Sequence, residues 1–201
     1  GLRPAADVAI AVDVAATQFF AGDGVYRLRG DAPRAVDAAA LIDELERWCD
    51  MHPIVSLEDP LAEDDWEGWA DATLRLGSRV QVIGDDLFVT DLARLERGIR
   101  EKVANSVLVK PNQAGTLSGA WAVVRRAREA GYGVVVSARS GDSEDAWLAD
   151  LAVGWRARQI KVGSLARAER TAKWNRLLRI EAELGDAAGF AAADLHGSLS
   201  V

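Results

Sequence analysis

The sequence predicts an α/β fold that forms part of a (β/α) barrel. Short apolar or β-branched segments alternate six times with longer amphipathic segments. After the first, the strand ends are about 25 residues apart, which is the size of a βα unit with short loops. A polar or charged residue stands at the C-terminal end of each short segment. Alternation implies a parallel sheet covered by helices, and (β/α) barrels build their active sites at these strand ends.

Six segments are predicted to be strands, because strands covered on both faces are short and mostly apolar. They are Val8–Val14, Ile54–Leu57, Val80–Ile83, Ser106–Lys110, Gly133–Ser137 and Arg158–Val162.

Six longer segments between and after the strands are predicted to be helices with one apolar face. Asp91 and Thr116 are predicted N-caps, and Gly131 stands where a glycine ends a helix. The predicted helices are Arg34–Asp50, Asp65–Leu76, Asp91–Lys102, Thr116–Ala130, Ser143–Val153 and Ala166–Leu184.

Alternation alone leaves a barrel and a doubly wound sheet open. No glycine-rich phosphate loop opens a helix, which disfavours a dinucleotide-binding sheet. A complete barrel needs eight strands and about 250 residues, so we expect residues 1–190 to form a barrel portion and residues 191–201 a C-terminal tail. The strand-end residues favour the barrel, and they are Asp13, Glu58, Asp85, Lys110, Ser137 and Lys161.

The composition is that of a globular domain, with 201 residues of which 49% are hydrophobic. The formal net charge of -7 argues against nucleic acid as a partner. No apolar run approaches the roughly 20 residues of a membrane helix, and the first residues lack a signal-peptide pattern. We therefore expect a cytoplasmic protein without a membrane partner. Cys49 is the single cysteine, which excludes a disulfide within one chain.

Three acids and two lysines stand at the ends of the predicted strands. Asp13, Glu58 and Asp85 would repel one another unless a cation neutralised them, and Mg²⁺ prefers such oxygen ligands. Lys110 and Lys161 follow on later strands. A lysine beside a divalent cation is a candidate general base, because the nearby positive charge lowers its pKa.

The segment after the fifth strand carries an anion-binding pattern. Arg139 offers a planar fork for a carboxylate or phosphate, and the Ser140 hydroxyl stands beside it. Each of these site residues also has an ordinary interpretation as a cap, a surface group or a member of a structural ion pair. Four further acids are candidates for supporting or capping roles, namely Asp59, Asp86, Glu144 and Asp145.

The motifs around these positions resemble those of enolase, the phosphopyruvate hydratase of glycolysis. Order and spacing agree from about residue 6 to about residue 190, a far more specific signal than one short motif. The matching stretches include Ala11–Ala16, Ser56–Pro60, Gly84–Thr90, Lys110–Gln113, Ser137–Asp145 and Gln159–Ser164.

The resemblance implies a Mg²⁺-dependent lyase with a TIM-type barrel and a small phosphorylated three-carbon acid as its substrate. Asp13, Glu58 and Asp85 match the family's ligands for the first Mg²⁺. Lys110 matches the base that takes the C2 proton of 2-phosphoglycerate, and Lys161 matches the lysine that holds the substrate carboxylate.

Arg139 and Ser140 match the phosphate-binding pair of the family. A lysine base with one or two Mg²⁺ ions is a known arrangement for stabilising the enediolate that this reaction forms.

The matched segment lacks the family's N-terminal α+β domain and the first, antiparallel part of the barrel. Those parts carry further catalytic groups, so the segment alone would lack half of the machinery. We expect the intact polypeptide or a complementary chain to supply them, and a homodimer where the N-terminal domain is present.

Two residues depart from the family pattern. Ala138 replaces the active-site histidine, and a methyl group can neither donate a hydrogen bond nor relay a proton. Pro111 replaces a β-branched residue after the base lysine. Three hypotheses stay open: an enolase, a paralogue with an altered second step such as a carboxyphosphonoenolpyruvate synthase of phosphonate biosynthesis, and a non-catalytic enolase remnant that serves as a binding module.

Overall fold

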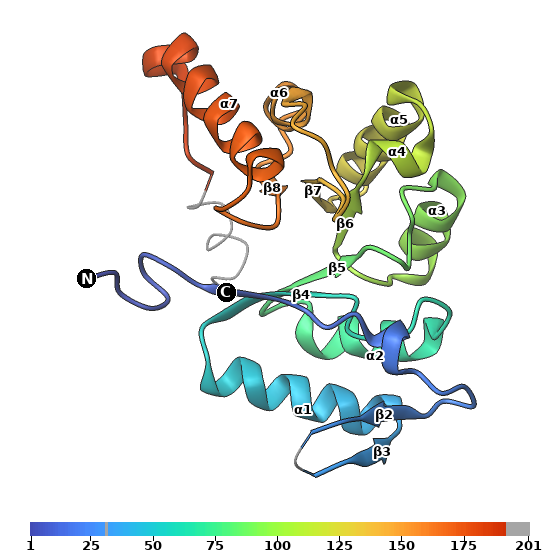
Figure 1. Cartoon of the computed structure of the whole chain (residues 1–201). Coiled ribbons are helices and arrows are strands. Elements are labelled where there is room, and N and C mark those ends of the chain that lie inside the picture. The colour runs from blue at the N-terminus through green and yellow to red at the C-terminus, as the bar shows by residue number, and fades with distance from the viewer. Residues whose placement is uncertain (31, 192–201) are drawn as a thin grey trace. The chain divides into compact units, whose positions relative to one another are not determined.

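A computed structural model of the chain describes residues 1–30 and 32–191 (Figure 1). Its parallel strands and covering helices confirm the predicted α/β class. The chain divides into two compact units. The first contains Gly1–Phe88 and Ala93–Ser106, and the second contains Val89–Leu92 and the residues from Val107 onward. The predicted tail lies almost entirely outside the described residues.

The first unit contains three parallel strands in the order β1-β4-β5. α1 packs on β4 and α2 packs on β5, while α1 and α2 also contact each other. These elements are β1 (Ile10–Asp13), α1 (Ala38–Met51), β4 (Ile54–Glu58), α2 (Trp66–Leu76), β5 (Gln81–Gly84) and α3 (Leu92–Glu101).

Aspartates fix the starts of the first two long helices. The Asp37 carboxylate accepts a hydrogen bond from the Ala40 backbone N–H at 2.8 Å. The Asp65 carboxylate accepts one from Gly68 at 3.1 Å. Such caps satisfy backbone donors that have no partner inside the helix. The sequence placed the second start correctly, at Asp65.

A β-hairpin precedes the first helix, where the sequence prediction was wrong. Arg34–Val36 forms strand β3, which pairs antiparallel with β2 (Tyr26–Leu28), and the helix begins only at Ala38. A short 3₁₀ helix, η1 (Ala16–Phe19), lies before the hairpin. The hairpin buries Tyr26, whose hydroxyl accepts from the Ala62 N–H at 3.0 Å and donates to Asp65 at 2.6 Å.

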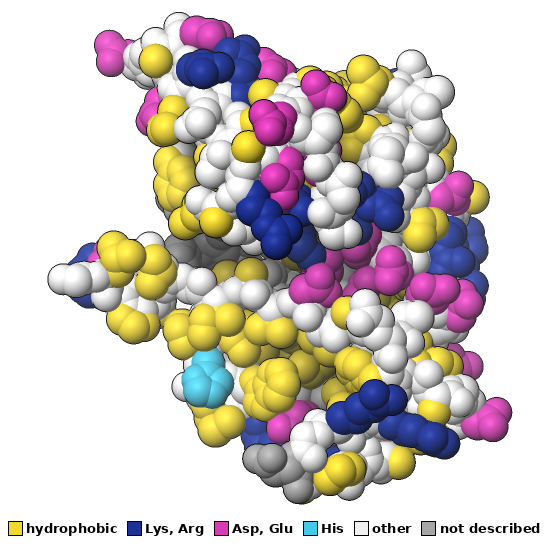
Figure 2. Space-filling view, in the orientation of Figure 1, with side chains coloured by type: hydrophobic (Ala, Val, Ile, Leu, Met, Phe, Trp, Pro, Cys, Tyr) yellow, Lys and Arg dark blue, Asp and Glu magenta, His cyan; other side chains and the backbone are white. Residues whose placement is uncertain are grey.

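The strands differ in how well they are covered. Ile10 in β1 is 44% exposed, whereas Leu57 in β4 and Val82 in β5 are fully buried. Figure 2 shows hydrophobic side chains gathered on the surface of the first unit, whose exposed apolar residues include Val8 and Met51. The first strand is therefore the least protected part of this sheet.

The second unit contains parallel strands in the order β6-β7-β8. α5 packs on β7, and α6 packs on β7, β8 and α7. These elements are β6 (Ser106–Val109, with Ser106 counted in the first unit), α4 (Pro111–Ala114), α5 (Leu117–Glu129), β7 (Gly133–Ser137), α6 (Trp147–Gly154), β8 (Gln159–Lys161), α7 (Ala168–Leu184) and the 3₁₀ turn η2 (Gly185–Ala187).

The helix caps of α5 are those that the sequence predicted. Thr116 accepts from the Gly119 N–H at 3.0 Å, and Gly131 follows the helix with a φ of +80° that suits glycine. α6, predicted from Ser143, begins only at Trp147. Ser143 and Asp145 instead form a turn in which the Asp145 N–H donates to the Ser143 hydroxyl at 3.3 Å.

Phe88 packs tightly after the strand that ends at Gly84. A Cβ built on Gly84 would lie 2.5 Å from the Phe88 ring, and one built on Gly98 of α3 would lie 2.6 Å from it. The ring is fully buried. Both positions therefore need glycine as long as Phe88 keeps this place.

Within the described residues, no helix is both long enough and apolar enough to cross a membrane.

Candidate active site

Three predicted metal ligands stand at the carboxyl ends of strands in the first unit. Asp13 ends β1 and is the register partner of Glu58, which ends the neighbouring β4. Asp85 follows the last residue of β5 directly. Glu58 and Asp85 are 5% and 8% exposed, whereas Asp13 is exposed. Parallel pairing thus brings the first two side chains to one edge of the sheet.

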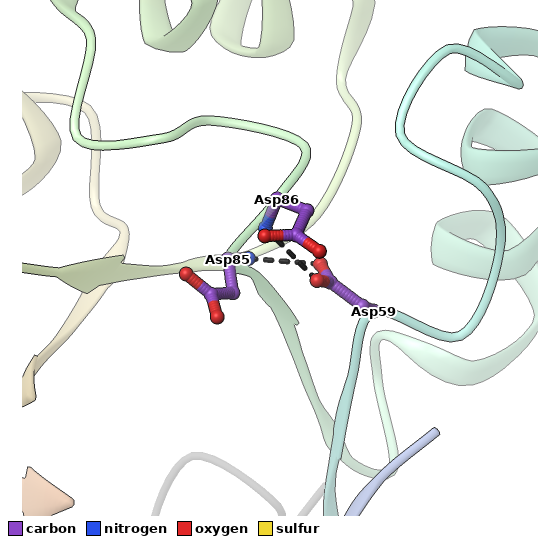
Figure 3. A group of neighbouring side chains, drawn as sticks. All are labelled: Asp59, Asp85 and Asp86. Atoms are coloured by element: carbon purple, nitrogen blue, oxygen red, sulfur yellow. Dashed lines mark hydrogen bonds between the residues drawn. The ribbon is translucent and has the colours of Figure 1, made fainter. Parts of the chain in front are cut away.

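The tightest acidic cluster in this unit consists of Asp59, Asp85 and Asp86 (Figure 3). One carboxylate oxygen of each lies within 4.8 Å of the others. The Asp59 carboxylate accepts hydrogen bonds from the backbone N–H groups of Asp85 and Asp86, both at 2.9 Å. Asp59 therefore fixes the turn after β5, which agrees with the capping role considered from the sequence.

Backbone geometry and burial mark Asp59 further. Its φ of +42° is unusual for a residue other than glycine. Burial raises the pKa of its carboxyl group from 3.8 to about 7, against the two backbone donors that lower it. The neighbouring carboxylates of Asp85 and Asp86 raise the pKa as well. A cation beside this group would favour the charged form.

The chemistry of the donors fits the divalent cation that the resemblance implies. The three groups of the Asp59, Asp85 and Asp86 cluster are carboxylates, and at these separations their negative charges repel one another. Hard oxygen ligands of this kind suit Mg²⁺. The observed cluster shares Asp85 with the predicted ligand set and adds Asp59 and Asp86.

Lys110 stands at the end of β6, directly before the short helix α4. Its backbone N–H donates to the Thr90 hydroxyl at 2.9 Å, and this hydroxyl donates to the Gln113 side chain at 2.9 Å. Pro111 occupies the first turn of α4, a position that tolerates proline because no helical N–H is needed there. The departure at residue 111 is thus compatible with a fixed Lys110 backbone.

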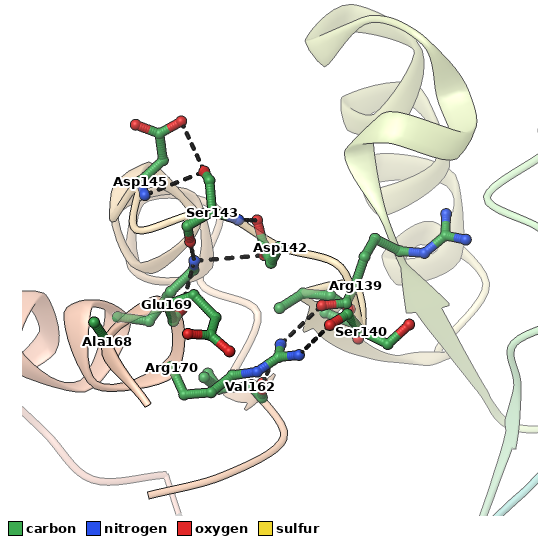
Figure 4. A network of polar contacts seen from close by, with 12 residues as sticks. Arg139, Ser140, Asp142, Ser143, Asp145, Val162, Ala168, Glu169 and Arg170 are labelled. Carbon is green, nitrogen blue, oxygen red and sulfur yellow. Dashed lines mark hydrogen bonds and ion pairs between the residues drawn. The ribbon is translucent and has the colours of Figure 1, made fainter. Parts of the chain in front are cut away.

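The loop after β7 is held from α7 by two buried cations (Figure 4). Arg170 donates to the carbonyl groups of Arg139 at 2.8 Å, Ser140 at 2.7 Å and Val162 at 2.9 Å. Lys173, 1% exposed, donates to the Ser143 and Glu169 carbonyl groups.

Strand pairing ties the start of this loop to β8. Ser137 is the register partner of Lys161, and the Ala138 N–H donates to the Lys161 carbonyl at 2.9 Å. The structure therefore brings Lys161 and the Ser137–Ser140 segment to one edge of the second unit.

The Arg139 side chain points away from this network in Figure 4. Its guanidinium group is exposed and makes no hydrogen bond or ion pair with any described residue. It remains open to an anionic ligand.

Sequence reasoning missed Arg170 and Lys173. Both are basic residues on a long helix, and such residues usually lie on the solvated face. No signal in the sequence separates them from their exposed neighbours.

A scan against family models matches residues 1–198 with "Enolase, C-terminal TIM barrel domain". The chain belongs to this family. The match confirms the resemblance and the partial TIM-barrel fold class drawn from the sequence. In a barrel of this type, the active site is built at the carboxyl ends of the strands. The roles of the individual residues stay predictions, and so does the division into residues 1–190 and a tail.

Proposed function

We propose that the chain provides the barrel part of a Mg²⁺-dependent enolase-type lyase of glycolysis, acting in the cytoplasm on a small phosphorylated three-carbon acid. The reaction would convert 2-phosphoglycerate to phosphoenolpyruvate. The observation that carries the proposal is the position of the acids and lysines. Asp13, Glu58, Lys161, Asp85 and Lys110 each stand at the last residue of a parallel strand or directly after it.

The acidic edge of the first unit would hold the cation. A proton next to a carboxylate is weakly acidic, because its removal leaves a dianionic enediolate. A bound Mg²⁺ would supply charge stabilisation for that developing negative charge. Asp13, Glu58 and Asp85 are the proposed ligands, and Asp59 would keep Asp85 in place through the backbone contacts described above.

The second unit would supply the base and the substrate contacts. The Lys110 amine would take the proton from C2 as the C–H bond breaks. Lys161 would hold the substrate carboxylate, and the open Arg139 guanidinium with the Ser140 hydroxyl would hold the phosphate. The bond from C3 to its hydroxyl then breaks while the C2–C3 double bond forms. The hydroxyl would take up a proton from an acidic group of the N-terminal part that the family resemblance implies, and it would leave as water.

Exchange of the C2 proton of 2-phosphoglycerate with deuterated water, followed by NMR on the longest form of the protein, tests the proposal. We expect exchange with Mg²⁺ but not with EDTA, together with formation of phosphoenolpyruvate. Lys110→Ala should abolish exchange, whereas Lys102→Ala, at an exposed lysine, should not. Lack of exchange in a folded, Mg²⁺-binding protein would contradict the role of Lys110 towards this substrate.

Ala138 favours a second candidate, an enolase-like paralogue with a different second step, such as a carboxyphosphonoenolpyruvate synthase. Ala138 directly precedes Arg139 in the chain, and its methyl group offers no proton. Exchange without phosphoenolpyruvate would support this candidate. In the full-length protein, a strong gain in dehydration for Ala138→His would support an enolase instead.

The exchange experiment also separates a non-catalytic binding module from both the enolase and the enolase-like paralogue. Such a module would bind Mg²⁺ without any exchange of the substrate proton.

A further inference from the structure

Two consecutive β-branched residues after β5 have a backbone conformation that such residues rarely adopt. Val89 has a φ of +43° and Thr90 a φ of +53°. A left-handed conformation costs free energy at a side chain branched at Cβ, so it persists only where the surrounding contacts require it. Thr90 is 2% exposed, and both residues belong to the second unit. The contacts of Thr90 therefore indicate what this strained turn secures.

The Thr90 hydroxyl closes a ring of three hydrogen bonds around the backbone of Lys110. It accepts from the Lys110 backbone N–H at 2.9 Å and donates to the Gln113 side-chain oxygen at 2.9 Å. The Gln113 backbone N–H in turn donates to the Lys110 carbonyl at 2.9 Å. Both polar backbone groups of Lys110 are thus held by residues of the same unit.

Pro111 removes further freedom from the Lys110 backbone. The residue before a proline is kept out of the helical region, because the proline ring would clash with its backbone. Lys110 accordingly has an extended conformation, with a φ of -114° and a ψ of 100°. The direction in which the Lys110 side chain leaves the backbone is therefore fixed from both sides of the residue.

A second threonine shows that this hydrogen-bond pattern has no special meaning away from the proposed site. Thr73 on α2 accepts from the Ala104 N–H at 2.7 Å and donates to the Trp69 carbonyl at 2.8 Å. Thr73 lies inside a regular helix, whereas Thr90 is held in a left-handed conformation. Thr90 contacts the proposed base, and Thr73 contacts residues without a proposed role. Thr73 is therefore a matched control for Thr90.

We propose that Thr90 is a positioning residue for Lys110, because its hydroxyl fixes the backbone from which the Lys110 amine reaches the substrate. The proposal rests on the proposed function, since it takes Lys110 to be the base. A base must lie within hydrogen-bond distance of the proton that it takes, and a displacement of about 1 Å can lower a rate about 100-fold. Thr90 acts through Lys110 and not through contact with the substrate.

Thr90→Val tests this inference, since valine keeps the shape of threonine without the hydroxyl. In the longest form of the protein, we expect the rate of C2-proton exchange at saturating 2-phosphoglycerate to fall about 10- to 100-fold, with the half-saturating concentration unchanged. Thr90→Ser restores the hydroxyl and should restore most of the lost rate. Gln113→Met removes only the acceptor of that hydroxyl and should lower the rate by a smaller factor. It replaces the valine variant if that chain does not fold.

Two controls separate positioning from a general loss of stability. Thr73→Val removes the matched pair of hydrogen bonds and should leave the exchange rate unchanged, although it also removes contacts that stabilise the fold. Calorimetric titration with methylphosphonate probes the proposed phosphate contacts at Arg139 and Ser140, and titration with Mg²⁺ probes the acidic edge. Both affinities should be the same in Thr90→Val as in the unsubstituted protein.

NMR of the protein labelled with ¹³C at lysine Cε gives a measurement that needs no turnover. The chain contains four lysines, so single substitutions assign their signals. In Thr90→Val we expect the Lys110 signal to move or broaden while the Lys161 signal keeps its position. In Thr73→Val both signals should keep their positions.

An unmoved Lys110 signal in folded Thr90→Val would overturn the inference. Where the unsubstituted protein catalyses exchange, an unchanged rate in Thr90→Val, or an equal loss in Thr73→Val, would overturn it as well. A protein without exchange whose Lys110 signal still moves in Thr90→Val gives a different result. It supports the placement of Lys110 by Thr90 and rejects Lys110 as the base towards 2-phosphoglycerate.

Discussion

Two groups of strand-end residues are held in place by opposite means. The acidic edge of the first unit carries Asp13, Glu58 and Asp85, and the basic edge of the second unit carries Lys110, Arg139 and Lys161. In the first unit a buried carboxylate, that of Asp59, accepts hydrogen bonds from backbone N–H groups. In the second, buried cations at Arg170 and Lys173 donate to backbone carbonyl groups. Each edge is thus held by side chains that carry the same sign of charge as the groups it presents.

This difference indicates how each edge responds to change. A carboxylate that holds N–H groups adds negative charge, which a cation would balance. A cation that holds carbonyl groups adds positive charge beside the proposed phosphate contacts at Arg139 and Ser140. Loss of Asp59 should therefore weaken cation binding at the first edge without changing anion binding at the second. Loss of Arg170 should have the opposite effect.

The largest effect is expected for Arg170→Met. This change takes the donor away from one buried carbonyl contact, at Val162, and from two part-buried ones, at Arg139 and Ser140. It should cost about 3–5 kcal/mol of unfolding free energy. Chemical denaturation measures the loss, and phosphonate titration should show weaker binding with unchanged Mg²⁺ binding. Arg167→Met, at an exposed residue, serves as the control and should change stability by less than about 0.5 kcal/mol.

The second-largest effect is expected for Asp59, whose titration should change the free energy of unfolding with pH. Its folded pKa of about 7 lies above the ordinary 3.8, so the folded chain keeps a proton that the unfolded chain loses. In EDTA this group should lower the free energy of unfolding by roughly 2–4 kcal/mol as the pH rises from about 4 to about 7. Asp59→Asn should remove this part of the slope, and Mg²⁺ should reduce it. Identical pH profiles for the two chains in EDTA would contradict the prediction.

Asp59→Asn should also weaken Mg²⁺ binding about 10- to 100-fold, because supporting residues of a metal site usually contribute that much. Calorimetry with Mg²⁺ alone measures the change. Asp64→Asn, at a residue with 79% side-chain exposure, should leave the affinity unchanged. Unaltered phosphonate binding in both variants would confirm that the effect is confined to the acidic edge.

The smallest effect is expected for the ion pair between α6 and α7. Arg176 contacts both carboxylate oxygens of Asp150 at 3.0 Å, and the guanidinium lowers the pKa of that carboxyl group. Because both side chains are partly exposed, Asp150→Asn should cost less than about 1 kcal/mol. A double-mutant cycle with Arg176→Met measures the coupling, which should fall in high salt and as the pH drops through the lowered pKa. The prediction is contradicted if the coupling free energy between Asp150 and Arg176 is as large as the loss of unfolding free energy in Arg170→Met.

The sequence predicted the parallel strands well because each is a short, mostly apolar run, and those from β4 to β7 are largely buried. Gly133–Ser137 is identical in prediction and structure, and Ile54–Leu57 differs by one residue. The β2–β3 hairpin was missed, since its strands of three residues are too short for a period to show. The predicted start of α6 was four residues too early, because the polar residues of the turn at Ser143 resemble those at the start of a helix.

For the candidate site, the sequence predicted which side chains stand at strand ends but not what holds them. Glu58 and Asp59 are adjacent acids, and only the backbone shows that Asp59 turns towards the N–H groups after β5. Burial decides the roles of Arg170 and Lys173 in the same way. Contacts between residues far apart in the chain leave no local pattern to recognise.

The packing of Phe88 between Gly84 and Gly98 limits how this chain can diverge. A methyl group at either glycine would need a smaller side chain at residue 88, and a smaller side chain there would leave a gap that larger residues at 84 or 98 can fill. The three positions should therefore change together among homologues. Since Gly84 directly precedes Asp85, this evolutionary coupling would be interpreted in alignments as a constraint on the proposed metal site, although its cause is the shape of one aromatic ring.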